Sequence, residues 1–68
     1  MAILTVEVAS HYREIYTVEA NSADHAIEKL KSGDYIDCFP EFQSVDKTFP
    51  EGIVTVVDSY GETILDNS

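Results

Sequence analysis

The stretch that decides the fold is Ser22 to Gly33, Ser-Ala-Asp-His-Ala-Ile-Glu-Lys-Leu-Lys-Ser-Gly. Its apolar residues recur at i, i+3, i+4 and i+7, a spacing that places them on one stripe of a helix. Ser22 is a good N-cap residue, because its hydroxyl can accept a backbone N–H of the first turn. Gly33 can adopt the left-handed conformation that ends a helix. The sequence therefore predicts an amphipathic helix whose buried stripe is Ala23, Ala26, Ile27 and Leu30.

Two alternating segments before the helix predict a pair of β-strands, residues 3–9 and 14–20. The polar residues 10–13 between them lack the Asn-Gly or Asp-Gly of a tight hairpin, so we expect a looser four-residue turn. Neither the hairpin nor the helix can bury its apolar face alone, and the helix is therefore expected to fold back over the hairpin. The expected inward-facing residues are Leu4, Val6, Val8, Tyr16, Val18 and Ala20.

The last part of the chain predicts a second hairpin. Residues 53–57 are β-branched throughout, which is typical of a central strand covered on both faces. A type I turn is expected over residues 58–61, with Gly61 free to take positive φ, before residues 62–65 return as the second strand. We expect the tail, residues 66–68, to be frayed.

The segment between the helix and this hairpin has a weaker pattern. Residues 34–39 include strand-forming residues, but Pro40 cannot donate to a ladder, so any strand here should be short or lie at a sheet edge. We interpret residues 40–52 as an irregular connection packed by its own aromatic rings. The sequence thus predicts a single α+β domain over residues 1–68, with one helix packed on a small, mostly antiparallel sheet in the chain order β-β-α-(β)-β-β.

Negative charge dominates the composition. Thirteen acidic residues face four basic ones, which gives a net charge of −9 at pH 7. Nucleic acid and anionic membranes repel such a chain, so a macromolecular partner is expected to offer a basic surface, although solubility alone also explains the acidity. The chain has no segment with the ~20 apolar residues that span a bilayer and no signal-peptide pattern, and its one cysteine fits a reducing compartment. We expect a soluble cytoplasmic protein, and a core this small leaves a homodimer possible.

Residue types that carry catalysis or hold metals are few and poorly spaced. His11 is expected in a turn, and His25 in the first helical turn, facing solvent. Cys38, between Asp37 and Phe39, is expected to be a small buried hydrophobe rather than a nucleophile. One cysteine and two histidines fall short of a zinc ligand set, and three scattered glycines cannot build a phosphate loop. We therefore expect no enzymatic activity, no catalytic residue, no metal site and no cofactor.

The sequence favours protein binding over catalysis, and residues 35–49 are the candidate interface. Aromatic side chains alternate there with carboxylates, an arrangement that suits a binding hot spot with a charged rim. The competing explanation is that the rings complete the core. The candidate partner-binding residues are Tyr35, Asp37, Phe39, Glu41, Phe42, Asp46 and Phe49.

The run from Tyr16 to Leu30 resembles the strand-to-helix unit of small DpnD/PcfM-like proteins of bacteriophages and mobile elements. In place of that family's glutamate run this chain has Ala23-Asp24-His25, and residues 34–50 have no counterpart. The resemblance implies a phage-encoded accessory protein in the host cytoplasm, and it carries over no site residue. The matching positions are Val18, Glu19, Ala20, Ser22, Asp24, Ala26, Ile27 and Glu28.

Three functions stay open at this point. The first is a non-enzymatic acidic protein that binds and modulates a host protein such as a polymerase, a nuclease or a defence complex. The second is a DNA-mimic inhibitor whose carboxylates imitate phosphates, and the third is an assembly module that works as a homodimer. Salt separates the first two, because binding by charge alone weakens steeply with ionic strength whereas aromatic-anchored binding persists. Sedimentation addresses the third.

Overall fold

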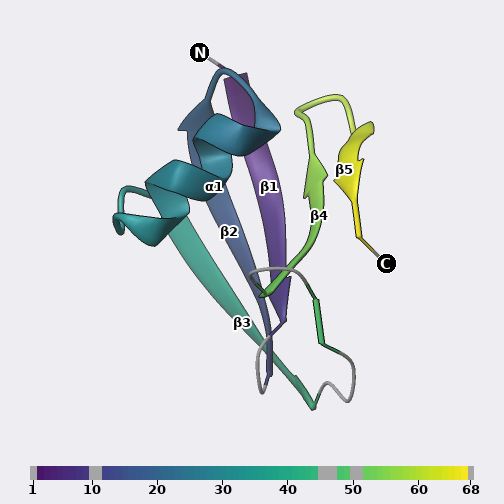
Figure 1. Ribbon diagram of the computed structural model, residues 1–68. Coiled ribbons are helices and arrows are strands. Elements are labelled where there is room, and N and C mark those ends of the chain that lie inside the picture. The colour runs from purple at the N-terminus through teal and green to yellow at the C-terminus, as the bar shows by residue number, and fades with distance from the viewer. Residues whose placement is uncertain (1, 10–11, 45–47, 50–51, 68) are drawn as a thin grey trace.

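A computed structural model describes residues 2–9, 12–44, 48–49 and 52–67, apart from the side chains of residues 41–44. Its elements are β1 (Ala2–Ala9), β2 (Tyr12–Ala20), α1 (Ala23–Lys31), β3 (Asp37–Ser44), β4 (Ile53–Val57) and β5 (Thr63–Asp66). The strands form one antiparallel sheet in the order β3-β2-β1-β4-β5, and α1 lies across one of its faces (Figure 1). The predicted α+β class and chain order are confirmed.

Helix α1 starts at the predicted cap. The Oγ of Ser22 accepts the backbone N–H of His25 at 3.2 Å, and the Nδ1 of His25 in turn accepts the backbone N–H of Asn21 at 3.0 Å. This reciprocal pair resembles a capping box and satisfies donors where the chain enters the helix. The expectation that His25 faces solvent holds only in part, because the residue is half-buried and its Nδ1 accepts a hydrogen bond at the cap. At the other end Gly33 has a φ of 80°, as predicted.

We expect Ser22→Ala to lower the free energy of unfolding by about 1 kcal/mol, because the His25 N–H loses its acceptor. Ser22→Asp should stay close to the wild-type stability, since a carboxylate accepts the same hydrogen bond and interacts favourably with the positive end of the helix. Urea denaturation of the three proteins measures the difference. A loss below about 0.3 kcal/mol in Ser22→Ala would show that this hydroxyl does not cap the helix.

The core lies between α1 and the face of the sheet that α1 covers, which we call the inner face. Leu4 of β1 pairs with Val18 of β2, while Val6 pairs with Tyr16 on one side and with Val56 of β4 on the other. Apolar side chains from three neighbouring strands therefore meet under the helix. The residues of this buried cluster are Leu4, Val6, Val18, Ala20, Ala26, Ile53 and Val56.

The apolar stripe of α1 packs on this cluster as predicted. Ala26 is fully buried, and its small side chain lets the helix backbone approach the sheet closely. Lys29 adds a hydrogen bond between the helix and the sheet, because its Nζ donates to the carbonyl oxygen of Glu19 in β2 at 2.7 Å. The other residues of the stripe are partly buried against the core and are Ala23, Ile27 and Leu30.

Strand β2 begins earlier than the sequence indicates. Tyr12 and Arg13, expected in a turn, are its first residues, and Arg13 pairs with Ala9 of β1. Residues 10 and 11 lie outside the described part of the chain. The turn predicted over residues 10–13 is therefore wrong for residues 12 and 13. Pairing with β3 extends the strand there, since Tyr12 lies opposite Ser44.

Strand β3 is the other element that extends past its predicted end. Residues 40–44, expected in an irregular connection, continue the strand, and Pro40 lies opposite Glu14 of β2. A proline fits here because β3 forms an edge of the sheet, where a residue can turn its missing donor away from its neighbour. The edge position is thus confirmed, whereas the expected break at residue 40 is wrong.

The β4–β5 hairpin turns where the sequence predicts. Gly61 has a φ of 82°, and its N–H donates to the carbonyl oxygen of Asp58 at 3.1 Å. The Oδ1 of Asp58 accepts the backbone N–H groups of Tyr60 and Glu62, each at 2.9 Å. The aspartate side chain therefore stabilises the turn that it opens.

Strand β4 is central, as predicted, whereas the tail departs from expectation. β4 lies between β1 and β5, with Ile53, Val54 and Val56 buried and its remaining two residues half-buried. The tail is not frayed at residues 66 and 67, because Asp66 belongs to β5 and Asn67 bonds back to β4. The backbone N–H of Asn67 donates to Val54 at 2.8 Å, and its side-chain amide donates to Ile53 at 2.9 Å.

Candidate functional site

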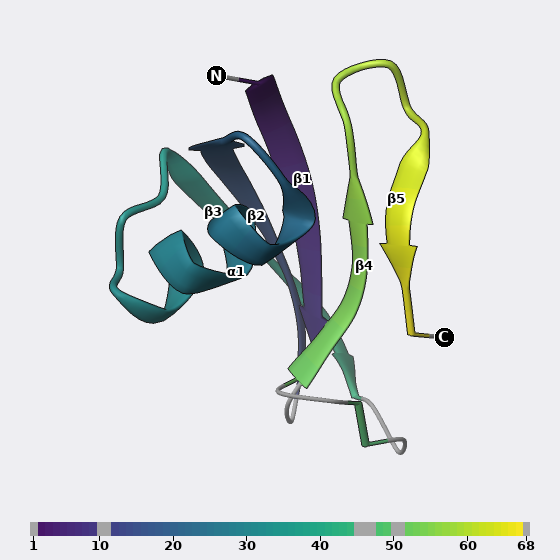
Figure 2. The same ribbon diagram turned by 45° about the horizontal axis from the view of Figure 1, so that its top comes forward.

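The face of the sheet opposite α1 is the candidate binding surface, and we call it the outer face. Figure 2 shows α1 in front of β1 and β2, with no second layer behind the sheet among the described residues. Because side chains alternate along a strand, the neighbours of the core residues point to this face. Its residues on β1, β2 and β3 are Ile3, Thr5, Glu7, Arg13, Ile15, Thr17, Glu19, Asp37 and Phe39.

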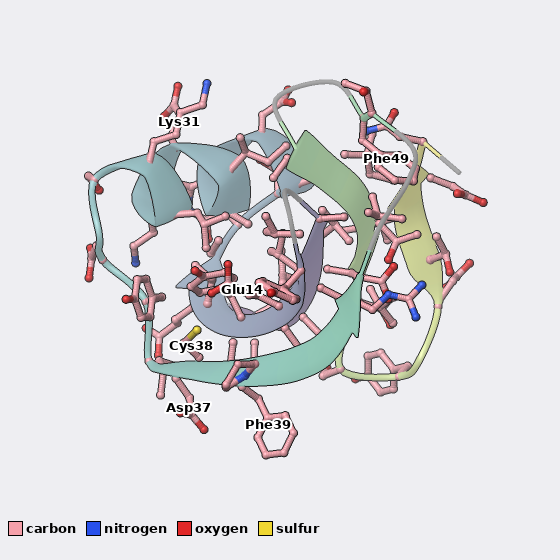
Figure 3. The ribbon with its side chains drawn as sticks, turned by 90° about the horizontal axis from the view of Figure 1, so that it is seen from below. Glu14, Lys31, Asp37, Cys38, Phe39 and Phe49 are labelled. Atoms are coloured by element: carbon pink, nitrogen blue, oxygen red, sulfur yellow. The ribbon has the colours of Figure 1, made fainter. Side chains whose placement is uncertain are left out.

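Strand register brings residues from three strands together around Phe39. Phe39 of β3 lies opposite Ile15 of β2, and Ile15 lies opposite Glu7 of β1. In the adjacent row Asp37 lies opposite Thr17. The view along the sheet in Figure 3 shows the side chains of Asp37 and Phe39 pointing away from the core on the same side of β3. An aromatic ring and a carboxylate are therefore neighbours on this face.

Phe39 exposes a large apolar ring to water, which costs free energy. Although it lies within a strand, 66% of its surface is accessible, and Ile3 on the same face is 41% exposed. Burying a phenylalanine side chain fully is worth about 1.5–3 kcal/mol. The isolated chain gains only part of this free energy, and a partner that covers the ring would gain the rest.

The charge of the outer face is negative. Arg13 pairs with Glu7, with an Nη2–Oε2 distance of 3.3 Å. Among the described residues Arg13 is the only basic one on this face, since Lys29 and Lys31 belong to α1 on the other side. Glu19 and Asp37 add two exposed carboxylates at its margin. Exposed apolar side chains next to carboxylates favour a partner with basic groups around an apolar patch.

The structure separates the residues of the predicted interface. Asp37 and Phe39 share the outer face. Tyr35 instead packs its ring edge to face against Tyr16 on the inner face, with ring centroids 4.8 Å apart. Phe49 is half-buried, and Figure 3 places it on the opposite side of the molecule from Phe39. The other three predicted residues are Glu41 and Phe42, whose side chains are outside the described part, and Asp46, which is itself outside it.

Two residues that surround Phe39 were missed by reasoning from sequence. Ile15 and Thr17 are half-buried on the outer face beside Phe39 and Asp37. Alternation alone assigns them to the face away from the core. Only the β2–β3 register shows which residues they accompany, and that pairing joins positions that are 20 and 24 residues apart in the chain.

Three polar side chains, those of Glu14, Tyr16 and Cys38, form a hydrogen-bonded group on the inner face. The Oε2 of Glu14 accepts the Tyr16 hydroxyl at 3.1 Å and the Cys38 thiol at 3.7 Å. Desolvation raises the pKa of the Tyr16 phenol above its usual range, and the adjacent thiol and carboxylate raise it further. Cys38 is half-buried rather than buried, and its carboxylate neighbour is the opposite of the electropositive setting that activates thiols. The contact between Glu14 and Cys38 joins β2 to β3 on the inner face.

Metal-ligating side chains do not gather among the residues that the structure describes. Among them, no cluster of three histidine, cysteine or acidic side chains could hold a metal ion. The helix that the structure describes is too short and too polar to cross a membrane. No family model, curated protein or solved structure matches this chain. The resemblance to DpnD/PcfM-like proteins therefore stays a prediction.

Proposed function

We propose that this chain is a non-catalytic protein-binding domain whose outer face binds a protein with a basic surface through Phe39. The exposed ring of Phe39, held in an ordered strand beside Asp37, is the observation that carries the proposal. Exposed aromatic anchors with a charged rim are typical of interfaces in which a few residues supply most of the binding energy. If the chain is phage-encoded, as the resemblance implies, the partner is a host protein that this binding modulates.

Charge favours a basic partner over a second copy of the chain. Each copy has a net charge of −9. A contact between two copies through the outer face would bring together two surfaces that both carry exposed carboxylates such as Glu19 and Asp37, which costs free energy in a partly desolvated interface. A basic partner instead gains from the same carboxylates and is steered towards them over about 8 Å, the Debye length at physiological salt.

The ring also favours protein binding over simple mimicry of DNA. A carboxylate array that imitates phosphates needs no exposed phenylalanine, and its affinity depends on charge alone. Phe39 lies opposite Ile15, so the part of the outer face along β3 and β2 contains an apolar pair. Binding through such a pair keeps most of its affinity as the salt concentration rises.

We expect Phe39→Ser to remove partner binding and Tyr60→Ser to leave it unchanged. Tyr60 is a matched control, because it is an aromatic residue that is 93% exposed but lies in the β4–β5 turn rather than on the outer face. The wild type and both variants are used as baits in a lysate of the cells in which the chain is made, at low and high salt. A protein retained by wild type and Tyr60→Ser but lost from Phe39→Ser is then purified and titrated into the ¹⁵N-labelled chain.

Amide shifts at residues 15, 17, 37 and 39 on adding that protein would support the proposal. Three outcomes would contradict it. Identical capture by all three baits, with binding lost at high salt, indicates recognition by charge alone. Shifts confined to α1 place the interface on the other side of the sheet. Sedimentation of the free chain as a dimer at micromolar concentration, with the outer face covered, indicates an assembly module.

A further inference from the structure

We infer that the partner presents an arginine to the outer face, where its guanidinium stacks on the Phe39 ring and pairs with the Asp37 carboxylate. This inference rests on the proposed function. Asp37 and Phe39 are two positions apart on one strand, so their Cα atoms are separated by roughly 6.5–7 Å and their side chains point the same way. A planar cation that bridges a ring and a carboxylate fits this spacing (Figure 3).

The surroundings of the pair hold it in place for such a ligand. The Oδ1 of Asp37 accepts the backbone N–H of Cys38 at 2.9 Å, which orients the carboxylate. Phe39 is backed on the sheet by Ile15, and Asp37 by Thr17. Ile15 is the cross-strand neighbour of the ring, and 66% of Phe39 stays accessible to a ligand. A pre-oriented pair binds with a smaller loss of side-chain entropy.

Arginine suits this site better than lysine. A guanidinium is planar, is less strongly hydrated than an ammonium group, and stacks on a ring while its N–H groups bond in the plane to a carboxylate. The outer face already contains one guanidinium–carboxylate pair, between Arg13 and Glu7 at 3.3 Å. A lysine ammonium would have to lose more water to reach the ring and can make no fork to Asp37.

The β4–β5 turn provides an internal comparison. Tyr60 is more exposed than Phe39, and it too lies two residues from an aspartate, Asp58. The Oδ1 of Asp58, however, already accepts two backbone N–H groups within the turn. Asp58 and Tyr60 also lie at a turn rather than on one face of a strand, so this second aromatic–acid pair serves as a matched control for the first.

Blocked hexa-arginine and hexa-lysine peptides are the probes, titrated into the ¹⁵N-labelled chain at physiological salt with affinities from calorimetry. We expect the wild type to bind the arginine peptide about tenfold more tightly than the lysine peptide, with the largest amide shifts at residues 37 and 39. Phe39→Leu, which keeps an apolar side chain but removes the ring, should reduce the ratio to below about threefold. Asp37→Asn should also reduce this affinity ratio to below about threefold, although the asparagine side-chain oxygen can still accept the Cys38 N–H.

Three variants control this result. Phe39→Tyr retains the ring and should keep the preference, as should Tyr60→Leu at the comparison site. Glu28→Gln removes one exposed charge from α1 and should weaken both peptides equally. Equal affinity of the wild type for the two peptides, or shifts centred away from residues 37 and 39, would overturn the inference. The capture experiment with Phe39→Ser decides separately whether the outer face binds a protein at all.

Discussion

Leu4→Ala is expected to lower the free energy of unfolding by about 3 kcal/mol, whereas Ile3→Ala lowers it by less than about 1 kcal/mol. The two residues are adjacent in β1 and similar in size, but Leu4 is 2% exposed in the core and Ile3 is 41% exposed on the outer face. Truncating Leu4 removes buried methyl groups and leaves a cavity under α1, while truncating Ile3 removes groups that already contact water.

Urea denaturation monitored by circular dichroism measures both losses. A chain of 68 residues is expected to have a total stability of about 3–10 kcal/mol, so Leu4→Ala should bring it close to unfolding at room temperature. Equal losses in the two variants would contradict the assignment of the two faces of β1. They would indicate that the outer face is covered as completely as the core.

Ala26→Leu is expected to destabilise the chain by about 2–3 kcal/mol, because the longer side chain must enter the contact between α1 and the sheet. Ala26 is fully buried in this contact. Glu28→Leu introduces the same residue on the exposed side of the same helix and should change the stability by less than about 0.5 kcal/mol. The same denaturation measurement compares the two. Stability equal to the wild type in Ala26→Leu would show that α1 is not docked through this residue.

The elements predicted well are those whose signals are local. The cap at Ser22, the buried stripe of α1 and the turn closed by Gly61 each depend on a few consecutive residues, and the structure confirms all three. The elements missed depend on partners distant in the chain. β3 continues through Pro40 because β2 pairs with it, and Asn67 is held by β4.

The candidate site shows the same division. Composition and spacing selected Asp37 and Phe39, but they also selected Tyr35, which the fold turns towards Tyr16. Residues 32–36 are irregular, so no helical or strand periodicity carries across them. The sequence pattern therefore cannot tell a ring that packs inward from one that points outward. The neighbours Ile15 and Thr17 became visible only with the sheet register.

Solvent paramagnetic relaxation measures most directly whether the outer face is open to a partner. A neutral gadolinium chelate is added to the isotopically labelled chain, and the broadening of each methyl and aromatic signal is recorded. We expect strong broadening of the Phe39 ring and the Ile3 methyl groups, and protection of Leu4 and Val18 in the core. Protection of Phe39 and Ile3 to the same degree as Leu4 and Val18 would contradict the account, because the outer face would then be covered.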